Sequence, residues 1–436
     1  MYKKLRPLNF ISLLLFTSFS TATTLPEAPP NFLPTVKQSS QNALDYLPYF
    51  GVNQRLLSQR QQLAFSYNYL QHYYSPWRTD RAIVSVQQQA QASLKHFFKY
   101  PGWGADHRPY SQQWIQDIIN NAQLFGIVNH VENAIIVNST TLRVMPTSQP
   151  SYTNWTKAGE GYPFDNVQQS LLSINTPIKV LHISRDRIWS LVIAPEANGW
   201  VKNKDLAFID ISTQMTLMQA NFYVTPIKDR GKWHIGSIYP VSKGATGQLE
   251  VLMATAQSPS NRAILQPILP PKGIAVVWPI AATPTIMAQL ANQLMGEPYG
   301  WGGLEGHRDC SATTRDLMAA LGIWLPRNSK AQLKQGTVYS LSGMKKRQKQ
   351  SFLRRKARPW LTLVGHPGHV MLYVGGRQGN TYVFHNKWGM ETRDIFGREG
   401  RSVIGHAAIT PTNLGEGFSN IPRSLLDTTT VMAVLQ

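Results

Sequence analysis

The chain has one cysteine, Cys310, among its 436 residues. A single thiol leaves no way to form a disulfide within the chain, so packing alone has to hold the fold together. Hydrophobic residues make up 42% of the sequence, which is ample for buried cores and argues against a disordered chain. At roughly 100–200 residues for each domain, this length predicts about two to four domains.

Residues 1–22 have the features of a secretory signal peptide. Three of the first six residues are basic, residues 10–19 form an apolar run, and Ser20 and Ala22 are small residues before a cleavage point after Ala22. The apolar run is shorter than the ~20 residues that span a bilayer. We therefore predict a periplasmic or secreted protein without a transmembrane span. An unpaired thiol is prone to oxidation outside the cytoplasm, which favours a chemical use for Cys310 over an inert, buried thiol.

The formal net charge of +20 favours polyanionic partners. In an exported protein, acidic envelope polymers or anionic membrane surfaces are better candidates than nucleic acid, and we predict no nucleic-acid partner. The basic stretch KKRQKQSFLRRKAR, residues 345–358, has eight Lys or Arg residues and no acid. Mutual repulsion predicts an exposed, solvated loop. The alternative is an electrostatic contact with an anionic wall or membrane polymer.

After the signal peptide, the residue pattern predicts several domains. Residues 23–125 begin with a Pro-rich linker and continue with helical periodicity over about 52–77 and 81–100, which predicts a mostly helical domain. Short β-rich runs broken by Pro, Asn and Gly then form two series, 126–212 and 213–281. They predict two small barrels in tandem or, alternatively, one larger β domain.

Residues 282–436 predict an α+β domain, with helices first and antiparallel strands after them. Thr283 is a suitable N-cap, Pro284 suits the first helical position, and Gly296 suits the end of that helix. A second helix is expected to start at Asp309.

Cys310 is expected in the first turn of this second helix, directly after its cap, Asp309. Unsatisfied backbone N–H groups at a helix start stabilise a thiolate, which predicts a lowered thiol pKa and a better nucleophile. The carboxylate of Asp309 opposes this effect, so a general base is still required.

Histidine is the expected base, and four histidines follow the cysteine. His369 begins one apolar strand and His385 ends the next, so a hairpin would bring the two together, one as base and one to orient it. His366 and His369 lie on opposite faces of a strand with no acidic cluster nearby, so we predict no metal site and no cofactor. These residues alone indicate a thiol hydrolase or acyltransferase.

Five motifs from about residue 283 onward resemble the NlpC/P60 cysteine peptidases, papain-like enzymes that cut peptidoglycan stem peptides. The motifs are YGWGG (299–303), RDCSA (308–312), LPRNS (325–329), PGHVMLYVGG (367–376) and VFHN (383–386). The upstream layout resembles the subgroup with a helical N-terminal segment and two bacterial SH3-like (SH3b) barrels, mainly through GEGYPFD (159–165). Ala312 stands where the family usually has a glycine after its DCS motif.

The resemblance implies a multidomain fold: an α-helical N-terminal segment, two small SH3-like β-barrels and a C-terminal α+β papain-like domain. It also implies roles for matched positions. Cys310 would be the nucleophile, His369 the general base and His385 the residue that orients the base. Tyr299 would help to stabilise the oxyanion. The positions implied to contact the substrate are Trp301, Asp309, Ser311, Arg327 and Ser329.

The resemblance also places the first barrel beside the active site, and with it Glu160 and Asp165. One of these carboxylates would pair with the free amine of an N-terminal L-Ala on the stem peptide, in a partly desolvated ion pair. Glycine, proline and aspartate are also common turn residues, so a simple turn is the alternative.

The sequence therefore predicts, by resemblance, an exported γ-D-glutamyl-L-diamino acid endopeptidase that acts on peptidoglycan stem peptides. A wall amidase that uses the same thiol is one alternative. A non-catalytic, wall-binding protein with SH3-like barrels is the other, although an intact Cys310, His369 and His385 argue against it.

Overall fold

In the computed structural model of the protein, the described residues are Val36, 39–78, 82–126, 128–243, 249–257, 259–377 and 379–436. The predicted signal peptide, residues 1–22, lies outside these ranges. Within them, no helix combines the length and the apolar character that crossing a bilayer requires.

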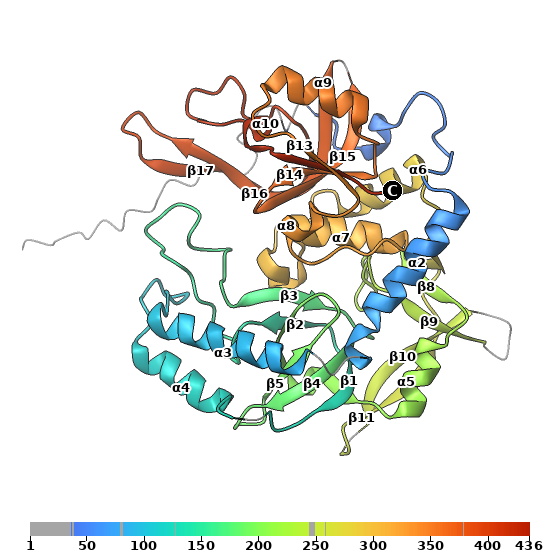
Figure 1. The fold of residues 1–436 in the computed structure, drawn as a ribbon, viewed down its shortest axis with the longest axis vertical. Helices are drawn as coiled ribbons and strands as arrows, with labels where there is room; N and C mark the ends of the chain where they lie inside the picture. Colours follow the sequence, from blue (N-terminus) through green and yellow to red (C-terminus); the bar gives the residue numbers. More distant parts are fainter. Residues whose placement is uncertain are drawn as a thin grey trace, which may run out of the picture.

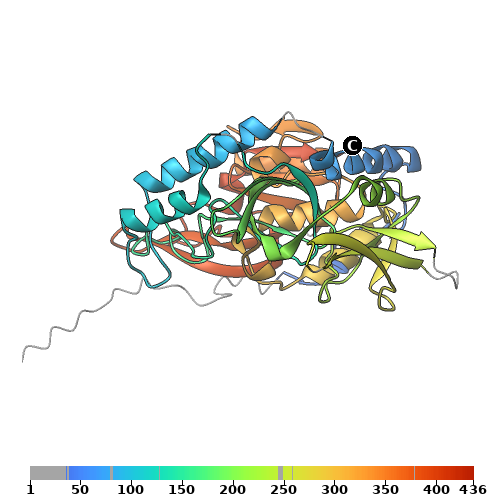
Figure 2. The same ribbon diagram turned by 90° about the horizontal axis from the view of Figure 1, so that it is seen from below.

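The N-terminal part is helical, with α2 (Gln59–Tyr73), α3 (Ile83–Lys99) and α4 (Gln112–Ala122). Helices α2 and α3 confirm the two helical segments that the periodicity predicts, whereas α4 is not predicted from the sequence. Figure 2 shows α3 and α4 lying side by side along the curled strands of the first β series. Apolar residues of both helices share a buried core with that series, including Trp189 and Trp200.

Helix α2 ties the C-terminal domain to the β strands (Figure 1). The side-chain amide of Gln62 donates to the carbonyl oxygens of Ile280 at 2.6 Å and Leu321 at 3.0 Å. Farther along the helix, the hydroxyl of Tyr73 donates to the carbonyl oxygen of Asn175 in the first β series at 2.9 Å. The helix therefore fixes the two parts relative to each other.

The middle of the chain forms a continuous sheet in the order β12-β8-β9-β10-β11-β7-β1-β4-β5-β6-β2-β3. The strands of the first series are β1 (Glu132–Ile136), β2 (Thr140–Arg143), β3 (Gln168–Leu172), β4 (Pro177–Ile183), β5 (Trp189–Ile193), β6 (Asn198–Lys202) and β7 (Leu206–Phe208). Those of the second are β8 (Tyr223–Pro226), β9 (Tyr239–Lys243), β10 (Leu249–Gln257), β11 (Arg262–Ile268) and β12 (Ala275–Trp278).

The two β series are joined, and each has a buried cluster of its own beside one that they share. They meet where Arg262 of β11 pairs with Phe208 of β7. One buried cluster surrounds Val180 in the first series and another surrounds Tyr239 in the second. A further cluster contains residues of both series, among them Ala207 and Tyr223. A sheet with separate and shared clusters has features of both predicted alternatives, the tandem barrels and the larger β domain. Helix α5 (Ile211–Met218), which the sequence does not predict, occupies the boundary placed near residue 212.

The C-terminal domain is built on an antiparallel sheet in the order β13-β18-β14-β15-β16-β17 (Figure 1). Its strands are β13 (Thr337–Ser340), β14 (Thr362–His366), β15 (His369–Arg377), β16 (Asn380–Arg393), β17 (Glu399–Pro411) and β18 (Val431–Val434). One face is covered by α6 (Pro284–Leu294), α7 (Cys310–Ala320) and α8 (Ser329–Gln332), and the other by α9 (Lys346–Lys356) and α10 (Leu425–Thr428). This confirms the predicted α+β character.

The local signals around α6 are confirmed. The hydroxyl of Thr283 accepts a hydrogen bond from the backbone N–H of Ile286 at 3.2 Å, and Pro284 is the first residue of the helix. Gly296 follows the helix with a φ of 78°, which favours glycine. One boundary is wrong: β16 does not end at His385, because the strand continues to Arg393 opposite β17.

The basic stretch 345–358 is not the solvated loop that its charge predicts, because most of it forms helix α9. Two of its side chains are buried, Lys349 and Leu353. Leu353 packs into the core on this face of the sheet. The ammonium of Lys349 donates to three carbonyl oxygens, those of Leu426 (2.9 Å), Asp427 (3.2 Å) and Thr429 (2.7 Å). These two anchors hold the helix against the sheet despite the repulsion among its exposed charges.

Candidate active site

Helix α7 begins where the sequence predicts and carries Cys310 at its first position. Asp309 is the N-cap, and its carboxylate accepts a hydrogen bond from the backbone N–H of Ala312 at 2.9 Å. The Cys310 side chain is buried in the same cluster as Val370, whose backbone N–H lowers the pKa of the thiol. The thiol therefore lies beside the start of β15, whose first residue is His369.

The two histidines meet as the predicted hairpin requires. Nε2 of His369 lies 2.8 Å from Nδ1 of His385. On the far side of His385, its Nε2 lies 3.0 Å from the hydroxyl oxygen of Thr410 on β17. All three side chains are buried. The hydrogen-bonded row His369–His385–Thr410 therefore ends beside the cysteine, and Thr410 is a member that the sequence does not predict.

The direction of the protons along this row decides whether His369 can act as a base. If His385 donates from Nε2 to Thr410, its Nδ1 is left as an acceptor for the Nε2–H of His369. The remaining nitrogen of His369, Nδ1, then carries a lone pair and can take the proton of a thiol. The opposite direction would protonate Nδ1, so base catalysis requires Thr410 to accept.

The thiol of Cys310 is not activated in the resting site as the sequence predicts. Burial raises its pKa to about 11, and the negative charge of Asp309 adds to the rise. The Val370 N–H and the cations of Arg327 and Lys387 lower the pKa, but their combined effect is smaller than the rise caused by burial and Asp309. The expectation of a lowered thiol pKa is wrong because desolvation of the thiolate outweighs the helix start.

The histidines are neutral for the same reason. Burial, helped by the charge of Lys387, holds the pKa of His369 well below 6.5 and lowers the pKa of His385 to about 3. A neutral thiol therefore faces a neutral imidazole at pH 7. Proton transfer from Cys310 to His369 has to accompany attack on a substrate rather than precede it.

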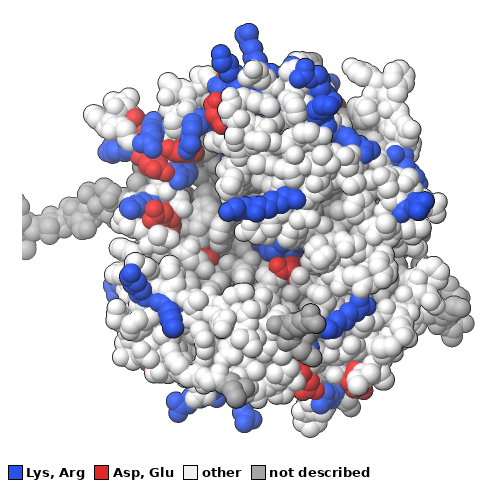
Figure 3. All heavy atoms as spheres, viewed as in Figure 1, with Lys and Arg blue, Asp and Glu red and all other residues white. Residues whose placement is uncertain are grey.

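A pocket of about 630 Å³ opens at the thiol, between the C-terminal domain and the first β series. Figure 3 shows this face hollowed between the upper and lower parts of the molecule. The lining includes the thiol, the predicted substrate-contacting positions and two residues of β3: Cys310, Trp301, Asp309, Ser311, Arg327, Ser329, Gln168 and Gln169. The structure therefore gathers these predicted positions around the nucleophile.

Arg327 and Asp309 form the charged wall of this pocket. The guanidinium donates to both carboxylate oxygens, at 2.6 and 3.0 Å, and also to the hydroxyl of Ser311 at 2.7 Å. Although burial raises the pKa of Asp309, Arg327 and the donated hydrogen bonds outweigh it and the net shift is downward. Tyr299 lies close by, and burial together with the charges of Cys310 and Asp309 raises its pKa. Its hydroxyl therefore stays protonated and can donate.

The loop that contains GEGYPFD reaches the site through an aromatic residue. The ring centroid of Phe164 lies 5.3 Å from that of Trp301 and 6.2 Å from that of Tyr299. Neither predicted carboxylate of this loop, Glu160 or Asp165, lines the pocket at the thiol.

Asp165 has a structural role in place of the predicted contact with substrate. Its side chain is 1% exposed and forms an ion pair with Arg143 at 3.1 Å. It also accepts from the backbone N–H groups of Ser151 and Val167, both at 2.9 Å. A carboxylate engaged in this way is not free for an amine. Glu160 is half-buried, and its carboxylate has neither a hydrogen bond nor an ion pair with a described residue.

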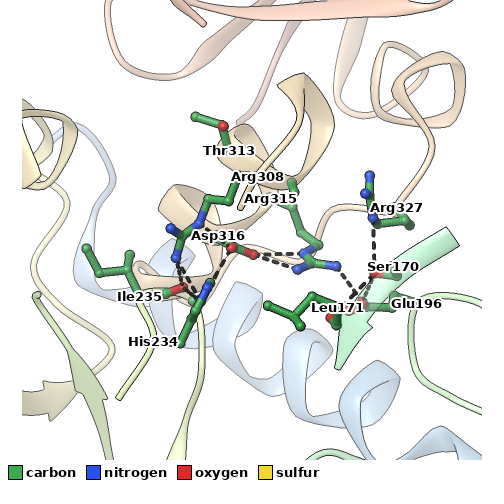
Figure 4. Close-up of polar contacts among 12 residues, drawn as sticks. Ser170, Leu171, Glu196, His234, Ile235, Arg308, Thr313, Arg315, Asp316 and Arg327 are labelled. Atoms are coloured by element: carbon green, nitrogen blue, oxygen red, sulfur yellow. Dashed lines mark hydrogen bonds and ion pairs between the residues drawn. The ribbon is translucent and has the colours of Figure 1, made fainter. Parts of the chain in front are cut away.

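Charged side chains behind α7 connect the helix to both β series (Figure 4). Arg308, directly before the cap, is fully buried and pairs with Asp229 at 2.6 Å, Glu297 at 2.9 Å and Asp316 at 2.7 Å. One of its nitrogens also lies 2.7 Å from Nδ1 of His234. Since Asp229 and His234 lie between β8 and β9, the second β series holds the residue that leads into the nucleophile.

Two further arginines connect to the first β series. Arg315 of α7 pairs with Glu196 at 2.6 Å and with Asp316 at 2.8 Å. Nε of Arg327 donates to the hydroxyl of Ser170 on β3 at 3.1 Å. Sequence reasoning misses this network and Thr410, because their partners lie far apart in the chain. A local signal exists only for Arg308, through its place in the RDCSA motif.

Three stretches of the chain match models of known families. Residues 8–125 match the N-terminal stabilising domain of NlpC/P60 proteins, residues 150–202 match an SH3 domain of the SH3b1 type, and residues 296–398 match the NlpC/P60 family. The C-terminal domain is an NlpC/P60 domain. The second β series lies outside these matches, so a second SH3-like barrel stays a prediction.

The fold is similar to that of an NlpC/P60 endopeptidase from Photobacterium damselae subsp. piscicida, at a TM-score of 0.81 and 25% identity over 91% of this chain and 97% of that one. An NlpC/P60 family protein from Bacillus cereus ATCC 10987 aligns at a TM-score of 0.46 and 16% identity, over 69% of this chain and 99% of that one. No curated protein matches the chain.

The matched ranges divide the site between two domains. The NlpC/P60 match contains Cys310, His369 and His385, and the SH3b match contains Gln168 on the opposite wall of the pocket. Thr410 lies beyond residue 398, where the NlpC/P60 match ends.

Proposed function

We propose that the chain is an exported cysteine peptidase that cleaves the γ-D-glutamyl-L-diamino acid bond of peptidoglycan stem peptides. One observation carries the proposal. Cys310 lies beside the first residue of a buried row, His369–His385–Thr410, at a pocket lined by the positions that an NlpC/P60 domain is expected to use. The similarity to an NlpC/P60 endopeptidase supports the reaction class.

The chemistry follows from the neutral resting state. As the Cys310 sulfur attacks the γ-carbonyl carbon, its proton moves to His369, whose other nitrogen is held by His385. The hydroxyl of Tyr299, which stays protonated, donates to the developing oxyanion. When the thioester forms, the proton on His369 passes to the departing amine of the diamino acid. Water, with His369 again as base, then releases the glutamyl acid and regenerates the thiol.

Digestion of purified muropeptides by the wild type and by Cys310→Ala tests the proposal. The expected products are an L-Ala-γ-D-Glu fragment and a peptide that begins with the diamino acid, identified by mass, with no cleavage by the variant. Release of whole stem peptides from the glycan would identify an amidase instead. Binding without cleavage by the wild type would identify a wall-binding protein.

We also propose that the enzyme recognises the free amine of an N-terminal L-Ala, with Glu160 as its partner. This carboxylate is half-buried and has no partner among the described residues, in a loop that packs against Trp301 and Tyr299 through Phe164. The comparison is between L-Ala-γ-D-Glu-diaminopimelate and its N-acetylated form. We expect the free amine to be preferred by the wild type and by Asp165→Asn, but not by Glu160→Gln. Equal rates for the wild type on both peptides reject amine recognition.

Export and contact with anionic envelope polymers complete the proposal. Five exposed cations line the outer side of the basic stretch: Lys345, Arg347, Arg354, Arg355 and Lys356. Figure 3 shows Lys and Arg side chains gathered over the upper part of the molecule, where α9 lies in Figure 1. Since α9 and α7 cover opposite faces of the sheet, a polymer on α9 leaves the pocket open. N-terminal sequencing of the mature protein tests export, with Thr23 as the expected first residue.

A further inference from the structure

Asn386, the polar residue that ends the VFHN motif, has no part in the mechanism. It directly follows His385 on β16, so the two side chains leave the strand on opposite faces. His385 joins the row with His369 and Thr410. Asn386 is fully buried on the other face, where its amide reaches the carbonyl oxygen of Arg308 before α7. One strand therefore contacts both the histidine row and the segment that leads into the nucleophile.

The amide nitrogen of Asn386 binds two segments at once. It donates to three carbonyl oxygens, those of Arg308 (2.9 Å), Pro298 (3.3 Å) and Glu297 (3.4 Å). Arg308 lies two residues before Cys310, and Pro298 directly precedes Tyr299. The segments that carry the nucleophile and the tyrosine are therefore both tied to strand β16.

Most of these carbonyl groups do not depend on Asn386 for a hydrogen bond. Two of the three oxygens accept from backbone N–H groups as well: that of Arg308 from Gly300 at 3.0 Å and that of Glu297 from Ala407 at 2.9 Å. The amide itself is poorly satisfied, because its Oδ1 is buried without a hydrogen-bond partner among the described residues. A buried acceptor without a donor is costly. The amide is therefore better explained by where it holds the two segments than by the hydrogen bonds that it satisfies.

We propose that Asn386 is a positioning residue that holds Cys310 and Tyr299 in place against the histidine row. This inference rests on the proposed function, in which His369 takes the proton of the thiol and Tyr299 donates to the oxyanion. Each partner has to be placed within a fraction of an ångström, and a displacement of about 1 Å can lower a rate about 10²-fold. Consecutive residues of β16 thus align the base and the nucleophile: His385 holds His369, and Asn386 holds the segment before Cys310.

The first experiment measures kcat and KM of Asn386→Leu on L-Ala-γ-D-Glu-diaminopimelate. Leucine has a similar volume and no donor. We expect kcat to fall about 10²-fold with KM close to the wild-type value, because the Arg327 pocket is held by other contacts. Gln62→Met removes another buried amide that donates to two carbonyl oxygens, on α2. It should lower the unfolding temperature and leave kcat unchanged. The same pattern in Asn386→Leu would overturn the proposal.

Asn386→Asp is a second variant, which keeps the shape of the side chain. While its carboxyl group is protonated, it retains one O–H donor. Burial against carbonyl oxygens favours that neutral form, so the variant should recover part of the lost kcat at acidic pH and lose it again as the pH rises. A kcat as low as that of Asn386→Leu at every pH would reject the donated hydrogen bond as the cause and overturn the proposal.

Alkylation of Cys310 by iodoacetamide needs no peptidase activity, so it separates this inference from the proposed function. The thiol is protonated at pH 7, and its reaction depends on His369 as base. Asn386→Leu should slow alkylation about tenfold, a part of the roughly 10²–10⁴-fold that a general base contributes. Adding the change to His369→Ala should slow it no further, because a missing base cannot be misplaced. Losses that multiply in the double variant would overturn the proposal. If the wild type cleaves no stem peptide, the proposed function fails and this cycle alone decides the role of Asn386.

Discussion

Helices α7 and α9 have the same length, 11 residues, and cover opposite faces of one sheet, but they are held in different ways. In α7, every residue except Arg315 is buried, and Arg315 itself is paired. In α9, only Lys349 and Leu353 are buried, and most of the cations face solvent. The first helix is buried along its whole length, whereas the second is held by two buried side chains and by contacts nearer the surface, such as the ion pairs of Lys346 with Glu416 and Asp427.

This difference shows how one sheet can support a precisely placed nucleophile on one face and a surface of exposed cations on the other. A nucleophile has to be held within a fraction of an ångström of its productive position, and Cys310 is placed by the packing of α7 and by the ion pairs of Arg308. A surface for a flexible anionic polymer needs available charge rather than fixed atoms. Mutations on the two helices should therefore differ sharply in their effects.

The largest effect is expected on catalysis, from changes in the row His369–His385–Thr410 beside α7. His369→Ala should lower kcat/KM by about 10²–10⁴-fold, the usual contribution of a general base. The mutant should unfold at the same temperature as the wild type to within a few degrees. His366→Ala, one strand away, is the matched control and should retain activity. An indispensable His366 with a dispensable His369 would contradict the proposed row.

The next largest effect is expected on stability, when the ion pairs of Arg308 before α7 are removed. Arg308→Met removes the ion-pair partner of the exposed Asp229 and the half-buried Glu297, and it leaves the buried Asp316 with Arg315 alone. The free energy of unfolding should fall by about 3 kcal/mol. The same change in α9, Arg347→Met, removes an exposed charge. It should change the free energy of unfolding by less than about 0.5 kcal/mol. Chemical denaturation of the two variants measures the contrast, and equal losses would refute it.

Within α9, the expected effect depends on which lysine is changed. Lys349→Met leaves three carbonyl oxygens, two of them buried, without their donor, and it should cost about 3 kcal/mol of unfolding free energy. Lys356→Met, at the exposed end of the helix, should be almost neutral. Thermal unfolding distinguishes the two. If both variants unfold like the wild type, Lys349 is not an anchor of α9.

The buried histidines predict how stability depends on pH. The pKa of His385 is about 3 in the folded protein and 6.5 when unperturbed. Between these values the unfolded chain binds a proton that the folded chain does not, so stability is full above 6.5 and falls as the pH falls toward 3. From about pH 7 to about pH 5, this group removes about 2 kcal/mol. His385→Gln should show a pH dependence smaller by that amount, and an unchanged dependence would show that His385 is protonated in the folded state.

The sequence predicts the α7 side of the domain well because its signals are local. A cap, the cysteine after it and a hairpin flanked by histidines lie within short stretches, and each was confirmed. The raised pKa of Cys310 could not be predicted in the same way, because it depends on burial by β15. Thr410 lies 25 residues from His385 and has no local mark that separates it from other strand threonines.

On the α9 side, local sequence signals predict the wrong structure. Eight basic residues in a row of fourteen predict repulsion, and only the carbonyl groups near residues 426–429 explain why a lysine can be buried there. Asp165 is a similar case, because its motif indicated a substrate contact while its actual partner, Arg143, lies on a neighbouring strand. Interpretation of charged residues fails where a distant partner neutralises them.

The smallest effect on the enzyme itself is expected from the exposed cations of α9. Replacing Arg347, Arg355 and Lys356 with Gln should change the free energy of unfolding by less than about 0.5 kcal/mol, because none of them has a partner in the described structure. Cleavage of small stem peptides should also be unchanged, since α9 and the pocket lie on opposite faces of the sheet.

The same triple variant should lose retention on an immobilised anionic polysaccharide. Each cation near a dense negative surface contributes about 1 kcal/mol, or roughly fivefold in binding. The difference from the wild type should disappear at high salt, because salt screens exposed charges. Lys202, Lys204 and Lys228 lie outside the C-terminal domain, and changing them to Gln gives a control with the same loss of charge. If both triple variants lose retention equally, net charge rather than the surface of α9 attracts the polymer.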